Sequence, residues 1–333
     1  MRKPFFRQIA ISFIACCISI LAFAFSCSND NRHPIIFVTY AEHPRQLYCA
    51  RVMIESIRTF GGDYKDVPVW LYVTGQLHKE ATETLQKFAS LNVEIKTCQA
   101  PEEALWFSLA NVVFMAAQAE TDAETRAAVI AMLGSDTVVL QAPDEFVLPG
   151  GISLGYRPVF HRNINPLFSE PLDDYWTRAY EIMDIQKSTV FPMVTPADDD
   201  TIRPYFQAGC LVVRPEKGIF RKWKAQFTAL YSDSLIRKMS EQDIKLRIFT
   251  FQAALTGAIL NNLERAEMMQ FSDRINYPVF FREMFGAKRD FHDITNATTI
   301  RYEHFFDDPP DGWDKQLTGP ADRIAWLKEH FDH

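Results

Sequence analysis

The chain has 333 residues, of which 47% are hydrophobic and 23% charged, and its formal net charge is −7. Such a composition provides enough apolar side chains for a large buried core and excludes an intrinsically disordered chain. The acidic residues are scattered and the basic residues form no patch, so we predict no nucleic-acid partner.

Residues 1–27 predict an export segment. Basic side chains occur within the first seven residues, an apolar run covers 9–25, and Ser26 and Cys27 follow. This is the pattern of a secretory signal. Ala24-Phe25-Ser26-Cys27 resembles a bacterial lipoprotein signal, in which the cysteine is lipidated and becomes the mature N-terminus.

Two other interpretations of the leader stay open. It can be a cleaved signal of a soluble exported protein, or an uncleaved anchor, because about 17 apolar residues sit at the lower edge of spanning length. The charge bias predicts an extracytoplasmic domain, held at the membrane by the lipid or the anchor. Residues 28–33 would be a short tether, and 34–333 a single domain.

The first part of the domain alternates strands and helices. Residues 34–40 are apolar and β-branched, as in a buried parallel strand, and 45–60 suit a helix that Gly61 and Gly62 stop. The alternation continues with a strand at 67–73, a helix at 78–91 and a strand at 93–96. Three such repeats predict right-handed crossovers in a doubly wound sheet.

Ligands of such sheets bind beyond the carboxyl ends of the strands. Thr39 and Tyr40 end the first predicted strand and are therefore candidate contacts for a nucleotide. A predicted helix over 101–131 precedes the apolar run 128–140, which Gly134-Ser135-Asp136 interrupts. Burying an uncompensated charge is costly, so an acid at the end of a buried strand indicates a specific role for that residue.

The second half is less regular. It contains no internal repeat and no segment that forces a domain boundary. Its predicted strands cover 152–156 and 209–213, and its predicted helices cover 171–185, 219–231 and 243–263.

The alternating layout and the segment Leu133-Gly134-Ser135-Asp136-Thr137-Val138-Val139-Leu140 resemble the GT-A glycosyltransferases, which use nucleotide-diphospho-sugar donors. In that superfamily a similar strand ends in an Asp-x-Asp motif. The resemblance implies an α/β (Rossmann-like) fold with a mixed central sheet flanked by helices. It also implies a divalent cation, Mn²⁺ or Mg²⁺, that bridges the donor diphosphate. Gly134 occupies the first acidic position, so only Asp136 of the motif remains.

Three further segments resemble family-eight retaining transferases, which include glycogenin-like enzymes. Segment 204–215 resembles their Phe-Asn-Ala-Gly segment, with Gln207 at the amide that borders the donor sugar. Segment 251–255 resembles an Asp-Gln helix start and contains Gln252. Segment 300–305 is similar to a strand whose histidine is a late metal ligand. The resemblance thus implies that Gln207 and Gln252 contact the sugar and that Asp136 and His304 bind the cation.

Segment 155–163 is dense in hydrogen-bond donors. Arg157, His161 and Arg162 can contact phosphate or sugar hydroxyls there, or belong to a solvated surface loop. Three consecutive acids at Asp198-Asp199-Asp200 point in different directions and predict a solvated loop.

Carboxylates elsewhere can supply a general base for an inverting reaction. The candidates are Asp173, Asp174, Glu241 and Asp243, and their spacing does not choose among them. Cys49, Cys98 and Cys210 are predicted to be buried thiols, although one disulfide is possible in an oxidising compartment.

The leading hypothesis is a glycosyltransferase that moves a sugar from a nucleotide-diphosphate donor to a glycan or other acceptor. The alternative is an exported carbohydrate- or nucleotide-binding protein that kept the fold and lost catalysis, because the acidic motif is incomplete and the leader separates the domain from cytoplasmic nucleotide sugars. A third possibility is a glycoside hydrolase, which requires two carboxylates facing one cleft.

Overall fold

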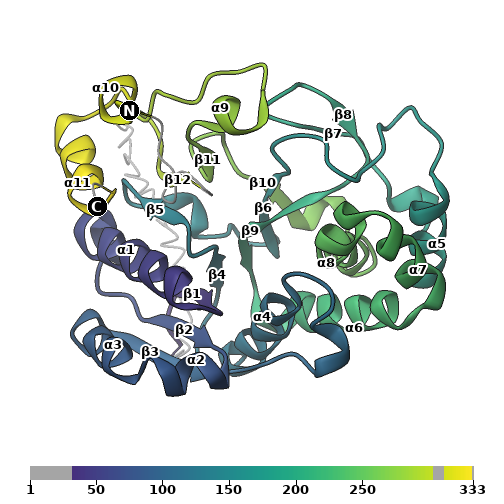
Figure 1. Ribbon diagram of the computed structural model, residues 1–333, viewed down its shortest axis with the longest axis horizontal. Coiled ribbons are helices and arrows are strands. Elements are labelled where there is room, and N and C mark those ends of the chain that lie inside the picture. The colour runs from purple at the N-terminus through teal and green to yellow at the C-terminus, as the bar shows by residue number, and fades with distance from the viewer. Residues whose placement is uncertain (1–31, 303–310, 332–333) are drawn as a thin grey trace, which may run out of the picture. The chain divides into compact units, whose positions relative to one another are not determined.

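The computed structural model describes residues 32–302 and 311–331 (Figure 1). The predicted leader and nearly all of the predicted tether lie outside these residues. The described residues from Arg32 onward belong to one compact unit. None of the helices in the described ranges combines the length and the apolar character needed to cross a membrane.

A seven-stranded mixed sheet forms the centre of the fold, in the order β10-β6-β9-β4-β1-β2-β3 (Figure 1). Six strands are parallel to one another, whereas β9 is antiparallel to both neighbours, β4 and β6. The strands are β1 (Ile36–Ala41), β2 (Val69–Val73), β3 (Val93–Thr97), β4 (Ile130–Leu133), β6 (Leu154–Pro158), β9 (Phe206–Val213) and β10 (Met268–Gln270). The predicted fold class, a mixed sheet flanked by helices, is confirmed.

The other strands form two small sheets. In one, β12 (Thr299–Arg301) lies between β11 (Tyr277–Pro278) and β5 (Thr137–Val139). In the other, β7 (Met193–Val194) pairs with β8 (Thr201–Ile202). The predicted strand 128–140 is therefore two strands in different sheets, and Asp136 lies in the turn that joins them.

Two layers of helices cover the central sheet, because alternate side chains of its buried strands enter separate cores. Ile36 and Val38 of β1 pack with one set of helices, and Ile35 and Phe37 pack on the opposite face. The first set comprises α4 (Ala110–Ala123), α5 (Asp174–Met183), α6 (Ile219–Ser232), α7 (Ser234–Gln242) and α8 (Ile244–Leu260), and the opposite face carries α1 (Pro44–Phe60), α2 (Gly75–Glu80) and α3 (Thr82–Gln86).

Two predicted helices have the wrong bounds. The helix predicted over 78–91 is divided into α2, α3 and a 3-10 segment at Lys87–Leu91. It begins early because the Thr74 hydroxyl accepts the N–H of Leu77 and caps α2. The helix predicted over 101–131 is shorter, since Leu109 has a left-handed backbone with φ of 59° and α4 begins only after it.

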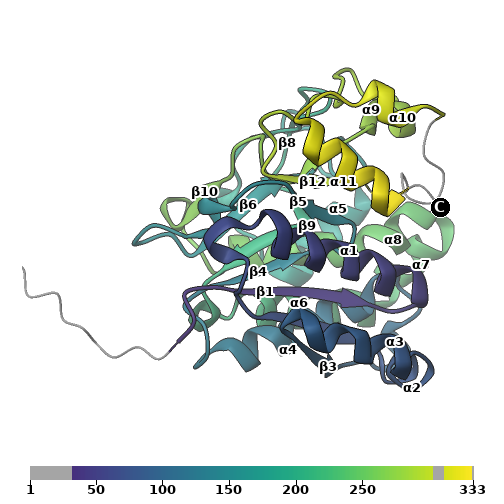
Figure 2. The same ribbon diagram turned by 90° about the vertical axis from the view of Figure 1, so that its left-hand side faces the viewer.

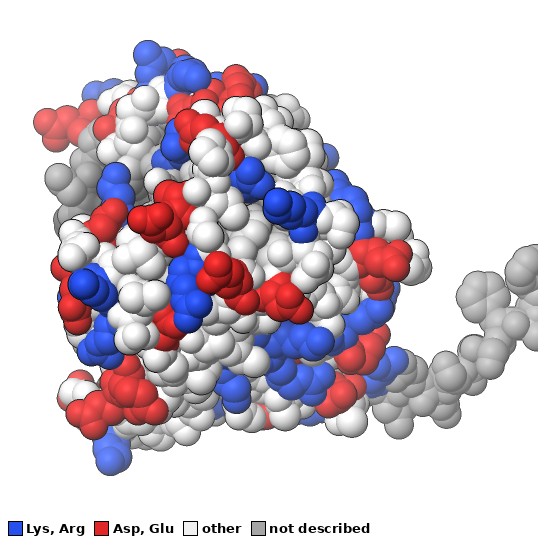
Figure 3. All heavy atoms as spheres, turned by 90° about the vertical axis from the view of Figure 1, so that its right-hand side faces the viewer, with Lys and Arg blue, Asp and Glu red and all other residues white. Residues whose placement is uncertain are grey.

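The C-terminal part returns to the beginning of the domain. It contains α9 (Phe281–Phe285), α10 (Trp313–Gln316) and α11 (Ala321–Phe331). Figure 2 shows α11 beside α1, where the Tyr48 hydroxyl donates to the His330 carbonyl at 2.7 Å. On another face, around α5 and α7, basic and acidic side chains are interspersed (Figure 3).

A buried acid joins two helices of the first layer. Glu120 of α4 is fully buried, and its carboxylate accepts the N–H groups of Phe220 and Arg221 at 3.1 and 2.8 Å. These groups belong to the first turn of α6, whose N-cap residue, Gly218, has no side chain to satisfy them. Burial raises the pKa of Glu120 to about 7. The two N–H groups and Arg221 favour the charged form and oppose this shift in part.

The three cysteines of the described part are free thiols, so the possible disulfide is not formed. Cys49 and Cys210 are buried as predicted, and Cys98 is partly buried. Burial raises the pKa of Cys210 to about 12, which keeps this thiol protonated and unreactive.

Candidate functional site

The sheet topology brings distant segments to one edge. The carboxyl ends of β1, β4 and β6 share an edge because these strands are parallel. The reversed strand β9 begins at the same edge, since Leu133 pairs with Cys210. The Gly134 N–H donates to the Gly209 carbonyl at 2.8 Å, so the degenerate acidic motif lies beside the start of β9.

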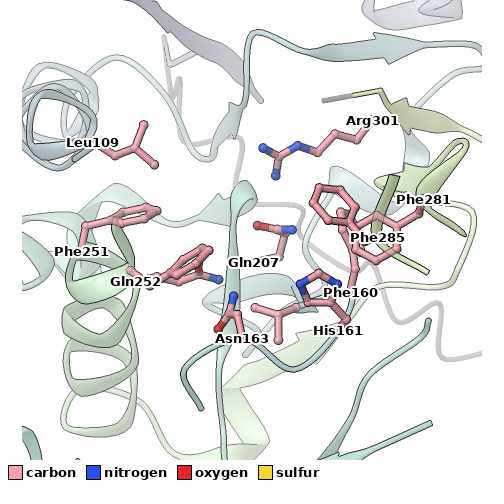
Figure 4. Close-up of a pocket in the computed structure, with 12 residues that line it drawn as sticks. Leu109, Phe160, His161, Asn163, Gln207, Phe251, Gln252, Phe281, Phe285 and Arg301 are labelled. Atoms are coloured by element: carbon pink, nitrogen blue, oxygen red, sulfur yellow. The ribbon is translucent and has the colours of Figure 1, made fainter. Parts of the chain in front are cut away.

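A cavity of about 260 Å³ opens beside this edge (Figure 4). One part of its wall is aromatic or aliphatic and comes from the residues after β6, the middle of α8, α9 and the residue before α4. The remaining part is polar and comes mainly from the same edge of the sheet. The polar lining residues are His161, Asn163, Gln207, Gln252 and Arg301, and the apolar ones are Leu109, Val159, Phe160, Phe249, Phe251, Phe281 and Phe285.

Both predicted glutamines line the cavity. Gln252 of α8 donates from Nε2 to the Phe206 carbonyl at 2.6 Å, which connects the helix to β9 and fixes the orientation of its amide. Gln207 is the next residue of β9 and lines the cavity. The residue is only 9% exposed, so its amide is held in the cavity wall, where a ligand can bind it.

His161 follows β6 and lies against two phenylalanines of the wall. Its ring is 4.9 Å from that of Phe281 and 5.3 Å from that of Phe285, measured between centroids. Burial lowers the pKa of His161 from its usual value of 6.5, so the imidazole is neutral at pH 7. A neutral imidazole can both donate and accept a hydrogen bond.

Asp136 forms an ion pair with Arg301 at the polar end of the cavity. Arg301 ends β12 and pairs in register with Thr137, the residue after Asp136. The pairing brings Arg301 Nε to 2.8 Å from Asp136 Oδ2. Figure 4 shows the Arg301 guanidinium extending towards Gln207. Asp136 itself does not line the cavity but lies behind Arg301.

Gly209 provides the space that this guanidinium occupies. A Cβ atom at position 209 would lie 2.4 Å from Arg301 Nη1 and 3.0 Å from Cζ. Real Cβ atoms do not approach other heavy atoms so closely, and therefore any larger residue would displace the arginine.

The described residues do not fit a divalent cation at this position. Such an ion needs several oxygen ligands, but the Asp136 carboxylate already accepts from Arg301 and position 134 carries no acid. A Cβ at Gly134 would lie 2.7 Å from Asp136 Oδ1, so restoring an acid there would disturb Asp136. In the described part of the chain, no group of three or more His, Cys, Asp or Glu side chains could bind a metal. His304 lies outside the described residues, and its role as a ligand stays a prediction.

The structure does not bring Arg157 to the cavity. Arg157 is buried, and its guanidinium donates to the Phe271 carbonyl at 2.8 Å and to Asp273 at 2.7 Å. Arg162 forms an exposed ion pair with Glu170. The two arginines therefore bind other residues of the chain. The sequence had offered them as possible contacts to phosphate or sugar.

Thr39 and Tyr40 lie near the carboxyl end of β1, as predicted, but do not line this cavity. Thr39 is fully buried, and its Oγ1 has no partner among the described residues. Tyr40 is partly buried and packs against the first helix layer.

The acids considered as general bases have structural positions. Asp173 caps α5 by accepting from Trp176, and Asp243 caps α8 by accepting from Lys245. Asp174 is exposed, and so is Glu241. Among the described residues no carboxylate lines the cavity, so the pair of facing acids that a glycoside hydrolase requires is not found there.

The acidic loop at 198–200 is not free in solvent. Asp198 accepts the N–H of Lys288 at 3.2 Å, and Asp199 forms an ion pair with Arg289. These contacts hold the loop against the segment after α9. The loop contributes no residue to the cavity.

The fold and the site together define an α/β protein with a half-polar, half-aromatic cavity at the carboxyl edge of a mixed sheet. The chain belongs to the family of the Rhodobacterales glycosyltransferase domain, whose sequence profile it matches over residues 36–261. The predicted relation to glycosyltransferases is confirmed by this match. No curated protein matches the sequence.

Several solved glycosyltransferase structures are similar to the chain. The galactosyltransferase LgtC, solved with donor and acceptor sugar analogs, is 13% identical, with 88% of this chain and 100% of LgtC covered and a TM-score of 0.47. Mouse xyloside xylosyltransferase 1 is 10% identical over 81% of this chain and 97% of its own, with a TM-score of 0.44. The S. cerevisiae mannosyltransferase Ktr4p is 8% identical, with 74% of this chain and 70% of Ktr4p covered and a TM-score of 0.45.

Proposed function

We propose that this protein transfers a glycosyl group from a nucleotide-diphosphate sugar to a hydroxyl-bearing acceptor in the cavity beside β9. Membership of a glycosyltransferase family supports the reaction class. The observation that carries the site is the convergence of Gln207, Gln252 and Arg301 on one cavity.

The reaction exchanges one bond to the anomeric carbon for another. The bond from this carbon to the phosphate oxygen breaks, and the nucleoside diphosphate leaves with the electron pair. A bond from the acceptor oxygen to the same carbon forms, and the acceptor hydroxyl passes its proton to a base, either the leaving diphosphate or the neutral imidazole of His161. Catalysis of this exchange requires positioning of the two substrates and compensation of the charge on the leaving diphosphate.

The residues of the cavity match these requirements. The amide of Gln207 can bind hydroxyls of the donor sugar, and Gln252 of α8 lies beside the start of β9. The neutral imidazole of His161 can accept a hydrogen bond from the acceptor hydroxyl. Phe281 and Phe285 offer an aromatic surface for the apolar face of a sugar ring. Tyr40, partly buried at the same edge of the sheet, is the proposed nucleotide contact, whereas its neighbour Thr39 is fully buried.

Replacing Gln207 with alanine tests the site. We expect kcat/KM for release of nucleoside diphosphate from UDP- and GDP-sugars to fall about 10- to 100-fold, because the sugar loses a positioned amide in a buried site. The matched control is Gln270→Ala, since Gln270 is an exposed glutamine at the end of β10. Thermal denaturation with UDP or GDP, in MnCl₂ or in EDTA, measures nucleotide binding separately from turnover.

Two results would oppose the proposal. If neither nucleotide raised the melting temperature and no sugar nucleotide were consumed, the chain would not be a transferase of this kind. Stabilisation by free glycans alone would instead favour the exported binding protein.

We also propose that the leader exports the domain and that lipid on Cys27, or an uncleaved anchor, holds it at the membrane. Both residue 27 and the leader lie outside the described residues, so the support is the signal pattern alone. In cells fed labelled palmitate, we expect label on the wild type, none on Cys27→Ser, and unchanged labelling of Cys98→Ser. An unlabelled wild type that stays in the membrane would indicate the anchor, and one in the cytosol would refute export.

A further inference from the structure

We propose that Arg301 takes the place of a divalent cation, so that the diphosphate of the donor is bound by a guanidinium and needs no metal. The inference rests on the proposed function, because it concerns how the same cavity holds its donor. It follows from the ion pair between Asp136 and Arg301, from the space at Gly209 and from the single acid left in the motif.

A leaving diphosphate requires positive charge close to its oxygens, because the breaking bond delivers an electron pair to them. Among the described residues that line the cavity, Arg301 is the one that carries a permanent positive charge. His161 cannot supply this charge at pH 7, since burial lowers its pKa and keeps it neutral. Of the lining residues in the described ranges, Arg301 is therefore the one that can supply this charge without a bound ion.

Arg301 has the chemistry and the support for this task. A guanidinium is planar, stays charged at all physiological pH values and donates along directions that match two phosphate oxygens. The Asp136 carboxylate accepts from Nε and so fixes the plane of the group, which Figure 4 shows extending into the cavity towards Gln207. Asp136 is thereby a positioning residue, and Gly209 provides the room for the guanidinium.

The same contacts oppose a cation at Asp136. Asp136 Oδ2 is 2.8 Å from the positively charged Arg301 Nε, so a dication placed beside this carboxylate would be repelled by Arg301. Gly134 occupies the first acidic position, so the motif itself offers no second oxygen ligand. The pair of one carboxylate and one guanidinium is therefore a poor site for a dication.

Calorimetric binding of UDP and of GDP tests the inference, with each titration run in excess EDTA and again in MnCl₂. For the wild type we expect affinities that differ less than about 2-fold between the two conditions. We expect Arg301→Gln to bind about 30-fold or more weakly in EDTA, and Arg301→Lys to lie between them, because lysine keeps the charge but loses the planar fork.

The matched control is Arg51→Gln. Arg51 forms a similar ion pair, from Nε to Glu55 Oε1 at 2.7 Å, on the exposed side of α1. We expect this variant to bind the nucleotide like the wild type.

Binding by the wild type that appears only with MnCl₂ and survives in Arg301→Gln would overturn the inference and leave the proposed function standing. Absence of binding in every condition would overturn the proposed function and, with it, the inference. Circular dichroism shows whether Arg301→Gln is folded. Asp136→Asn gives a second test if it is not.

Asp136→Asn keeps Arg301 and weakens only the group that orients it. Under the inference, nucleotide affinity falls about 3- to 10-fold and stays insensitive to EDTA. A metal-ligand role for Asp136 predicts instead that the variant loses a manganese-dependent component. Electron paramagnetic resonance of Mn²⁺ with UDP detects that component directly, without turnover.

Discussion

Gly209→Ala is expected to lower the affinity for nucleoside diphosphate about 10- to 100-fold without removing any polar group. The new Cβ would lie 2.4 Å from Arg301 Nη1, so the guanidinium must leave the position in which its Nε contacts Asp136. A charge-assisted contact that loses its geometry loses most of its contribution to binding. Calorimetry with UDP and GDP in EDTA measures the effect.

Gly150→Ala is the control for this substitution, because a Cβ at position 150 would have no atom within 4 Å. We expect the control to bind nucleotide normally. Unchanged binding by a folded Gly209→Ala protein would show that the position of Arg301 is irrelevant to the donor. Denaturation curves of both variants separate loss of binding from loss of fold.

The second large effect concerns stability and pH. The free energy of unfolding of the wild type is expected to contain a pH-dependent contribution from Glu120, which changes by about 3 kcal/mol between pH 4.5 and 7. The substitution Glu120→Gln should remove this contribution. The folded protein raises the pKa of Glu120 to about 7, while the unfolded chain has the ordinary value of 4.5. Between these values the folded state binds more protons. The contribution is therefore full below pH 4.5 and is lost as the pH rises through 7.

Urea denaturation of the wild type and the variant between pH 5 and 8 measures this component as the difference between the two proteins. Glu124→Gln is the control, because Glu124 is exposed and pairs with the same Arg221 at 2.9 Å. The wild type should lose stability relative to Glu120→Gln as the pH rises, but not relative to Glu124→Gln. A constant difference for Glu120→Gln would contradict the assigned pKa.

Hydrophobic pattern predicted most of the fold, because buried parallel strands produce continuous apolar runs. The strands predicted at 34–40, 67–73 and 93–96 correspond to β1, β2 and β3 with shifts of a few residues. Helix ends were harder to predict, since a left-handed backbone at Leu109 leaves no mark in an apolar residue. The helices α7, α9, α10 and α11 were not predicted, and of these α9 and α10 have only five and four residues.

Gln207 and Gln252, which the resemblance singled out, line one cavity, but the resemblance did not identify Arg301 as a site residue. Sequence spacing cannot show that β12 pairs with β5, and this pairing alone places Arg301 against Asp136. The same limit explains Arg157, whose partners Phe271 and Asp273 come from far along the chain. A glycine at 209 was the available signal, since glycine in a strand often marks a close approach by another group.

Because β9 runs in the reverse direction, changes at its first residues affect the cavity, whereas changes further along the strand affect the core. Because this strand starts at the ligand-binding edge, the segment before it, 195–205, leads directly into Phe206 and Gln207, while the rest of the strand continues through the core. A substitution at Gln207 would change the lining of the cavity, whereas Cys210 to Val213 of the same strand lie in the core. Relatives could in this way acquire new acceptors while the buried framework stays constant.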